Sequence, residues 1–179
     1  YFIVYCIKIA HMKRIFILLI SLTIASSCSS NEKAKAELPK VGPKQQVAVF
    51  AAGCFWGIQE GFSQLKGVVK ATSGYTGGTT KNPTYEQVNT DKTGHAEAVQ
   101  VIYDPAVISF AQLLEAFFVM HDPTQLNRQG PDVGTSYRSM AFYSNDTEKK
   151  QIETVIKRLN GKNLSGLVVT EVKPITTVY

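Results

Sequence analysis

Strand-like and helix-like stretches alternate along the chain from Gln46 to Lys173, and their order leaves few possible folds. Alternating or continuous apolar residues predict strands, whereas apolar residues spaced three or four apart predict helices. The predicted strands cover residues 46–52, 68–75, 96–103, 139–143 and 168–173, and the predicted helices cover residues 55–66, 110–118 and 147–159. The order β-α-β-β-α-β-α-β predicts an α+β fold, a two-layer ferredoxin-like sandwich with a mixed sheet and its helices on one face.

Local signals refine these boundaries. Gly67 is placed as the C-terminal stop of the first helix, and Ser109 with Gln112 forms a capping box before the second. Residues 79–93 form a long polar segment, and residues 120–137 are predicted to form a long loop. Because long loops in compact domains tend to be functional, the 120–137 loop is a candidate for part of a site.

The N-terminal segment has the pattern of an export signal. Met12 is followed by the basic pair Lys13-Arg14, a short apolar run and then Ser26-Ser27-Cys28. The run is too short for a spanning helix, which needs roughly 20 apolar residues, and a basic start with a short apolar run indicates a secretory signal. A cysteine directly after small residues resembles a bacterial lipoprotein processing site, at which Cys28 becomes acylated. The alternative is an ordinary cleaved signal in which Cys28 is incidental.

These patterns divide the chain into four parts. They are an upstream segment outside the mature protein (1–11), a signal peptide (12–27), a lipid-anchored flexible tether (28–44) and a globular domain (45–179). The tether is polar and rich in Lys, Glu, Ala and Pro, so it buries little. We therefore expect an exported bacterial lipoprotein that faces the periplasm or the cell surface and contacts the membrane through its lipid only.

The distribution of charge argues against a nucleic-acid partner. The formal net charge is +5, but three of these charges lie on Lys8, Lys13 and Arg14, before the domain begins. The remaining charges are spread without a cluster, whereas nucleic-acid binding requires a concentrated basic surface. Metal binding is not predicted either, because one domain cysteine and two scattered histidines give no ligand spacing.

The sequence Gly53-Cys54-Phe55-Trp56-Gly57 concentrates the chemistry of the chain. Cys54 lies where a buried strand turns into a helix, and the free N–H groups and dipole of a helix N-terminus favour the nucleophilic thiolate form. Phe55 and Trp56 can form an apolar pocket for a small alkyl group beside the sulfur. The alternative is that all three side chains belong to the core, because free cysteines are often buried and inert.

This pentapeptide resembles the signature of the A class of peptide methionine sulfoxide reductases. Further blocks of that family occur in its order, and the resemblance covers residues 46–179. The blocks are Gly74-Tyr75-Thr76-Gly77-Gly78, Asn82-Pro83-Thr84-Tyr85, Gly94-His95-Ala96-Glu97-Ala98-Val99, His121-Asp122-Pro123-Thr124 and Asp132-Val133-Gly134-Thr135-Ser136-Tyr137-Arg138-Ser139. The resemblance implies reduction of methionine S-sulfoxide, free or in oxidised proteins, and so a role in protein repair.

The resemblance also implies the role of each residue. Cys54 would attack the sulfoxide sulfur, and Glu97 would protonate the oxygen, which leaves poorly without a proton. The neighbours of Glu97 on its strand are apolar, and burial among them would raise the pKa of its carboxyl and keep it protonated. Five further residues would bind the substrate: Tyr85 and Tyr137 would hydrogen-bond the oxygen, Asp132 would complete the polar rim, and Phe55 and Trp56 would hold the methyl group.

The reaction leaves Cys54 as a sulfenic acid, which a thiol must reduce. Many family members carry recycling cysteines in a C-terminal tail, and this sequence stops at Tyr179, about where that tail would begin. We therefore expect an external thiol, either thioredoxin-like or small, to regenerate Cys54. We also expect a monomer without a bound cofactor.

Two other functions are compatible with parts of the pattern. Cys54 with His95 or His121 as its base would suit a papain-like hydrolase, although that leaves Trp56 and the tyrosines without a role. A lipid-anchored module that captures peptides through the aromatic pocket is the second alternative. In the reductase, His95 is instead expected to support the loop or Glu97.

Overall fold

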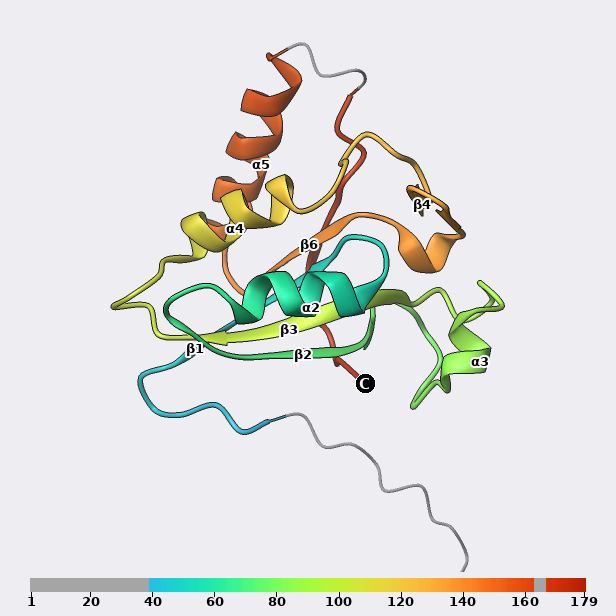
Figure 1. The fold of residues 1–179 in the computed structure, drawn as a ribbon, viewed down its shortest axis with the longest axis horizontal. Coiled ribbons are helices and arrows are strands. Elements are labelled where there is room, and N and C mark those ends of the chain that lie inside the picture. Colours follow the sequence, from blue (N-terminus) through green and yellow to red (C-terminus); the bar gives the residue numbers. More distant parts are fainter. Residues whose placement is uncertain (1–38, 163–166) are drawn as a thin grey trace, which may run out of the picture. The chain divides into compact units, whose positions relative to one another are not determined.

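The computed structural model describes residues 39–162 and 167–179, and its centre is a mixed five-stranded sheet (Figure 1). The strand order is β2-β3-β1-β6-β7. The strands are β1 (Gln46–Ala51), β2 (Val68–Thr76), β3 (Ala96–Tyr103), β6 (Met140–Tyr143) and β7 (Glu171–Pro174). Antiparallel pairing joins β2 to β3, β3 to β1 and β1 to β6, whereas β7 runs parallel to β6.

The order of the first four strands is that of a split β-α-β fold. The strand β3 lies between β1 and β2, which a helix connects, and β1 lies between β3 and β6, which a second helix connects. This is the ferredoxin-like arrangement. The predicted α+β class with a mixed sheet is therefore confirmed, and β7 extends the sheet by one strand.

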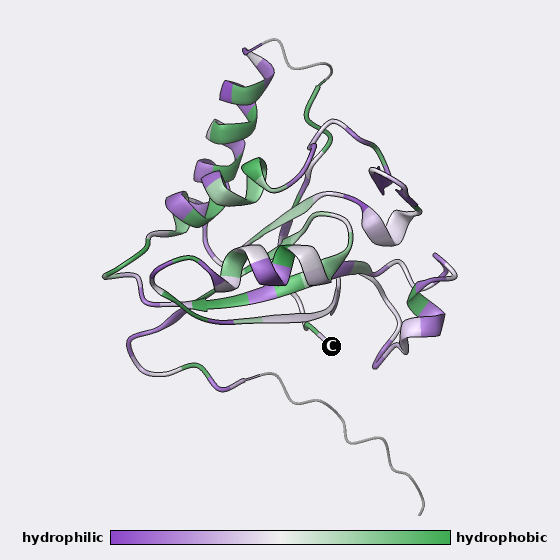
Figure 2. Ribbon diagram, in the orientation of Figure 1, coloured by the Kyte–Doolittle hydropathy of each residue, from purple (hydrophilic) through white to green (hydrophobic). Residues whose placement is uncertain are grey.

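Three helices cover one face of the sheet: α2 (Phe55–Ser63), α4 (Phe110–Val119) and α5 (Asp146–Asn160). Their apolar side chains pack on alternate residues of the central strands, among them Phe50 and Val101. Phe50 stacks against Phe62 and Phe117 at ring distances of 5.2 and 4.9 Å, so α2 and α4 share one aromatic core. In Figure 2, α5 alternates between green and purple, as expected of a helix with one apolar face.

The end of the chain covers the opposite face. Val178 is buried with the other set of alternate strand residues, among them Val49 and Ala98. Tyr179 pairs with Tyr75 of β2 through two backbone hydrogen bonds of 2.9 Å, one in each direction. The described residues thus form two layers plus a short C-terminal cover.

The helix boundaries differ from the sequence prediction by more than one residue at one point only, because α4 ends at Val119 and α5 covers Asp146–Asn160. The first helix was predicted over residues 55–66 but ends at Ser63, and Gly67 lies in the turn that follows. Gly67 has a φ of +98°, and a Cβ there would lie 2.8 Å from Ile108, so the turn requires glycine. The capping box of Ser109 and Gln112 is confirmed.

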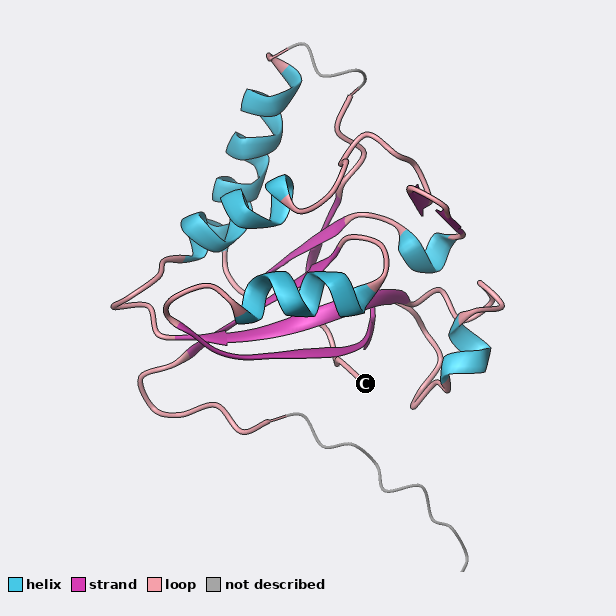
Figure 3. Ribbon diagram, in the orientation of Figure 1, coloured by secondary structure: helices cyan, strands magenta, loops and turns pink. Residues whose placement is uncertain are grey.

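Both segments predicted without regular structure contain short elements (Figure 3). The polar segment holds α3 (Tyr85–Val88), and the 120–137 loop holds the two-stranded pair β4 (Arg128–Gln129) and β5 (Asp132–Val133), then the 3-10 helix η1 (Thr135–Tyr137). The last strand begins at Glu171 rather than at residue 168. Local hydrogen bonds, not apolar periodicity, build the short elements, so the periodicity does not predict them.

The predicted upstream segment, signal peptide and acylated Cys28 lie outside the described residues. The tether (28–44) is described from residue 39 only. Among the helices of the described residues, none is long and apolar enough to cross a membrane.

Candidate active site

Cys54 is the N-cap residue of α2, three residues after β1 ends at Ala51. The turn between them depends on Gly53, which has a φ of +85°. A Cβ on Gly53 would lie 2.6 Å from the side chain of Gln129 in β4, so the short β4–β5 pair packs directly on the residue before the cysteine. Cys54 itself is partly exposed. The sequence prediction of a cysteine at a strand-to-helix junction is therefore confirmed.

The carboxyl group of Glu97 lies against the first turn of the same helix. The backbone N–H of Phe55 donates a hydrogen bond of 3.0 Å to Glu97 Oε2. The side chain of Glu97 is 2% exposed, and it projects from β3 on the helix-covered face, as Val99 and Val101 do. Burial raises the pKa of this carboxyl. The hydrogen bond from the Phe55 N–H acts to lower it and the nearby charge of Asp132 acts to raise it, and the pKa stays above its usual value. A carboxyl group with a raised pKa is suited to donating a proton.

The two aromatic residues after Cys54 differ sharply in exposure. Phe55 is 6% exposed, whereas Trp56 is 68% exposed, and their rings lie 5.8 Å apart. Phe55 therefore packs on the core with only a small exposed area, and Trp56 presents an apolar surface to solvent near Cys54.

Tyr75 is a site residue to which sequence reasoning gave no role. It lies directly opposite Glu97 in the β2–β3 pairing, so the two side chains are neighbours on one face of the sheet. Its ring lies 5.6 Å from that of Phe55. Burial raises the pKa of Tyr75 to about 12, and the charge of Glu97 is the next contribution. The signal that could have revealed Tyr75 is its register opposite Glu97, which requires knowing how the strands pair.

The electrostatic surroundings of Tyr137 show that the other predicted site residues lie near Cys54 and Glu97. Burial raises the pKa of its hydroxyl, and four further groups raise it electrostatically: Glu97, Tyr85, Asp132 and Cys54. These groups come from β3, α3, β5 and the start of α2, while Tyr137 ends η1. The structure thus brings together all seven residues predicted for the site. Tyr85 and Tyr137 lie in short helical turns rather than in irregular loops.

Two buried polar residues fix the segments that carry these groups. His95 accepts a hydrogen bond at Nδ1 from the Gly78 N–H (3.2 Å), and its Nε2 donates to the Thr80 carbonyl (2.7 Å). Arg138 donates to the carbonyl of Gly94 and also pairs with Glu171 at 3.1 Å. His95 therefore supports the loop between β2 and α3, as the sequence predicted.

The two domain histidines are not placed to act as a base for Cys54. Both ring nitrogens of His95 are engaged with the β2–α3 loop. In His121, Nδ1 bonds the Phe117 carbonyl at 2.8 Å and Nε2 bonds Ser139 Oγ at 2.7 Å. Burial lowers the pKa of His121. The geometry therefore gives no support to the papain-like alternative.

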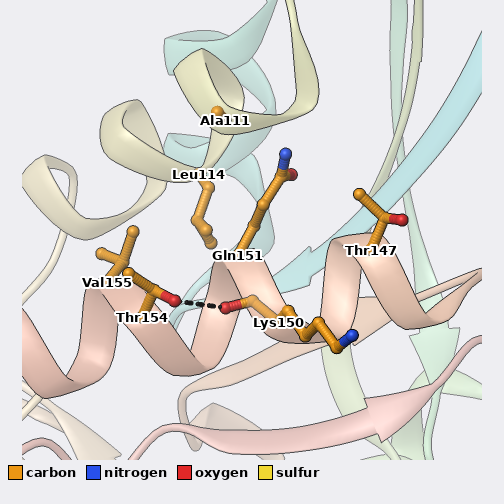
Figure 4. A pocket seen from close by; sticks show the side chains of 7 residues that line it. All are labelled: Ala111, Leu114, Thr147, Lys150, Gln151, Thr154 and Val155. Carbon is orange, nitrogen blue, oxygen red and sulfur yellow. Dashed lines mark hydrogen bonds between the residues drawn. The ribbon is translucent and has the colours of Figure 1, made fainter.

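A cavity of about 320 Å³ lies between α4 and α5 (Figure 4). Its lining residues are Ala111, Leu114, Thr147, Lys150, Gln151, Thr154 and Val155. None of them belongs to the predicted site, so this cavity and the Cys54 region are separate. Within residues 39–162 and 167–179, no group of three or more acidic, histidine or cysteine side chains could hold a metal ion.

Comparison with known proteins decides the family. The family model described as "Peptide methionine sulfoxide reductase" matches residues 46–179, three quarters of the sequence. The chain belongs to the peptide methionine sulfoxide reductase family. The reductase MsrA of Pasteurella multocida is 52% identical over 134 residues, which are 75% of this chain and 76% of that protein. MsrA of Methanosarcina acetivorans is 50% identical over 139 residues, 77% of this chain and 74% of that protein.

Solved structures agree with the assignment. Methionine sulfoxide reductase A of Corynebacterium diphtheriae matches with a TM-score of 0.70 at 33% identity, covering 77% of this chain and 70% of that one. Mxr1 from Saccharomyces cerevisiae in reduced form matches with a TM-score of 0.73 at 34% identity, covering 78% and 82%. This reductase is therefore an oxidoreductase that acts on methionine sulfoxide, which replaces both the hydrolase and the peptide-capture alternatives.

Proposed function

We propose that this reductase converts methionine S-sulfoxide to methionine with Cys54 as its nucleophile and Glu97 as its proton donor. The hydrogen bond from the Phe55 N–H to Glu97 carries the proposal, because it places a buried carboxyl group beside the backbone of the cysteine. One carboxyl oxygen, Oε2, accepts this bond, which leaves Oε1 to hold the proton. The raised pKa of Glu97 keeps that proton available closer to neutral pH.

The proposed step transfers one oxygen atom and two electrons. The Cys54 sulfur attacks the sulfoxide sulfur, and the sulfoxide oxygen takes the proton from Glu97. The attack forms a bond between the two sulfur atoms. The S–O bond of the substrate then breaks, a hydroxyl group becomes bonded to the Cys54 sulfur and the sulfur–sulfur bond breaks, so methionine leaves and a sulfenic acid remains. The substrate sulfur is reduced and the cysteine sulfur is oxidised.

The surrounding residues account for the choice of epimer. Tyr85 and Tyr137 bind the sulfoxide oxygen in this proposal and Asp132 completes the polar rim, while Phe55 and Trp56 contact the methyl group. A sulfoxide sulfur is a stereocentre, so only one epimer can place its oxygen on the polar side and its methyl group on the apolar side. This arrangement supports action on a single epimer, and the resemblance identifies it as the S form.

The sulfenic acid must then be reduced by two external thiols, which release water and form a disulfide. Cys54 is the one cysteine among the residues that the structure describes. A solved structure of Mxr1 from S. cerevisiae in complex with Trx2 matches this chain at 25% identity and a TM-score of 0.60. We therefore propose a thioredoxin-like protein or a small thiol as the reductant, and oxidised proteins and free methionine sulfoxide as substrates.

A single-turnover experiment tests the reaction. The full chain is mixed with an excess of a peptide carrying either the S or the R epimer, without reductant. We expect close to one methionine per protein from the S epimer, a sulfenic acid trapped on Cys54 by dimedone, and no product from Cys54→Ser. Equal turnover of both epimers, or product from Cys54→Ser, would overturn the proposal.

We further propose that the protein is exported and acylated on Cys28, because the basic start, short apolar run and small residues precede that cysteine. A polar tether of residues 28–44 would then hold the domain near the membrane. Fractionation and intact mass of the expressed protein test this, with Cys28→Ala as the comparison. We expect a lipid-modified membrane form for the original sequence and loss of that form in the variant. A soluble, unmodified mature form of the original sequence would contradict acylation.

A further inference from the structure

The two tyrosines proposed to bind the sulfoxide oxygen come from separate segments of the chain. Tyr85 opens α3, and Tyr137, which lies 52 positions later in the sequence, closes η1. A site that binds one oxygen atom from two sides requires a fixed distance between these segments. A side chain outside the predicted site makes the connection.

Asp91 links the two segments directly. It follows α3 by three residues, and its backbone N–H bonds the Val88 carbonyl at 2.9 Å. Its Oδ1 accepts two hydrogen bonds from η1: one from Thr135 Oγ1 at 2.9 Å and one from the Ser136 N–H at 2.8 Å. Burial acts to raise the pKa of this carboxyl, but the hydrogen bonds from Ser136 and Thr135 outweigh it and the pKa falls below its usual value. Asp91 is therefore a carboxylate at neutral pH.

The backbone on both sides of this contact is compatible with a close approach of Asp91 to η1. Asp91 has a φ of +60°, in the left-handed region that favours glycine. On the other side of the contact, Gly134 has a φ of +147°, and a Cβ there would lie 2.7 Å from Asp91 Oδ2. The chain thus adopts an unfavourable backbone conformation on one side and has no side chain on the other, and both allow the carboxylate to approach η1.

We propose that Asp91 is a positioning residue that fixes Tyr137 relative to Tyr85, and so sets the geometry for binding the sulfoxide oxygen. This inference rests on the proposed function, since it assumes that both tyrosines bind that oxygen. Asp91 acts through the two segments and does not contact the substrate.

Other contacts hold each segment when Asp91 is removed. Arg138 Nη1 donates a hydrogen bond to the Thr135 carbonyl at 2.7 Å, and the Gly134 N–H donates one to the Asn127 carbonyl at 3.0 Å. These bonds should hold η1 in place without Asp91. The α3 segment keeps its capping box of Thr84 and Gln87. Loss of the Asp91 side chain should therefore change the spacing of the tyrosines without unfolding the domain.

The test compares Asp91→Gly with Asp91→Asn in the full chain. Glycine tolerates the φ of +60° and removes the carboxylate, whereas asparagine also tolerates this conformation and keeps an oxygen acceptor at Oδ1. We expect kcat/KM for the S-sulfoxide peptide to fall about tenfold in Asp91→Gly, because small misplacements in a site cost up to about a hundredfold. Asp91→Asn should stay within about threefold of the original protein.

Further measurements separate positioning from general damage. Alkylation of Cys54 by iodoacetamide needs neither tyrosine, so its rate should stay within about twofold in both variants, and the melting temperature should stay above the assay temperature. Thr135→Val removes one partner without touching the Asp91 backbone and should lower kcat/KM about threefold. Asp104→Asn, at a remote turn where Oδ1 accepts the Ala106 N–H, is the matched control and should have no effect.

The outcomes distinguish the two proposals. If the original protein does not reduce the peptide, the proposed function fails. If the original protein is active and Asp91→Gly is equally active, or if Asp91→Asn loses as much as Asp91→Gly, the positioning role of Asp91 is wrong. An unfolded Asp91→Gly variant leaves Thr135→Val to decide: full activity there overturns the inference.

Discussion

The Phe55 N–H and Glu97 Oε2 are joined by a 3.0 Å hydrogen bond that connects the first turn of α2 to the start of β3. This bond uses a backbone donor that would otherwise have no partner within the helix. It also fixes the carboxyl group relative to Cys54 without any further side chain. The nucleophile and the proposed acid are therefore held by the rigid sheet and helix, whereas the groups that bind oxygen come from the peripheral turns.

Replacing Glu97 by glutamine tests its role as an acid. Glu97→Gln keeps the hydrogen bond from Phe55 and removes the titratable proton, so we expect the single-turnover rate to fall about a hundredfold or more. Peptide affinity should change little. In the original protein the single-turnover rate should decline as pH rises through the raised pKa of Glu97. This decline with pH should be absent from the variant.

Stopped-flow measurements over a pH series check this prediction. Glu115→Gln, an exposed carboxyl on α4 paired with Arg158, serves as the control and should follow the original profile. A Glu97→Gln variant with the original rate at any pH would transfer the acid role to another group, with Asp132 as the first candidate.

Tyr75 should influence Glu97 through burial. Tyr75→Ala removes the ring beside Glu97 and admits water, so the pKa of the carboxyl should fall and the decline in rate should begin at lower pH. Tyr75→Phe keeps the ring, so the pH at which the rate begins to decline should not change. The same pH series measures both variants, and identical profiles for Tyr75→Ala and the original protein would contradict the prediction.

Arg138 should contribute to stability through three attachments. Its side chain is 9% exposed and bonds the carbonyls of Thr135 and Gly94 as well as Glu171. We expect Arg138→Ala to lower the free energy of unfolding by about 2 kcal/mol, because two part-buried hydrogen bonds from its guanidinium to backbone carbonyls are lost, while the partly exposed Glu171 keeps Lys173. Urea unfolding measures the loss.

The exposed pair of Arg158 with Glu115 is the comparison, and Arg158→Ala should lower the free energy of unfolding by less than about 1 kcal/mol. Equal losses in the two variants would show that burial does not matter here.

His121 should make the fold sensitive to mild acid. Burial lowers the pKa of its imidazole below 6.5 in the folded state, so the unfolded chain binds a proton first as pH falls. The groups facing the ring are the Phe117 carbonyl, Ser139 and Asp122. The free energy of unfolding should therefore be highest at pH values above about 6.5, and it should decrease as the pH falls below that value.

Urea unfolding between pH 5 and about 8 measures this dependence. His121→Gln should be less stable overall but should show a smaller change over that range, and an unchanged pH dependence in the variant would assign it to other groups.

The sequence was sufficient for the parts of the site that depend on local pattern. The glycine-flanked Cys54 at a strand end and the apolar neighbours of Glu97 are both readable along the chain. The turns were not predicted, because α3 is only four residues long and carries little apolar periodicity. Its capping box of Thr84 and Gln87 repeats the pattern of Ser109 and Gln112 and could have revealed it.

Residues whose importance depends on distant partners could not be predicted in the same way. Tyr75 is significant because β2 pairs with β3 in a register that sets it opposite Glu97. Asp91 is significant because it meets Thr135, 44 positions away, across two turns. Neither contact has a periodic signal in the sequence, since each arises only when separate elements of the fold come together.

The exposure of Trp56 gives the protein an optical property. Trp56 is the single tryptophan of the chain, it is 68% exposed, and it lies two residues after Cys54. Indole emission moves to shorter wavelength when water is displaced from the ring, so a bound substrate methyl group should shift the intrinsic fluorescence of the whole molecule. No added dye or label is then needed, because all tryptophan emission originates beside the reactive sulfur.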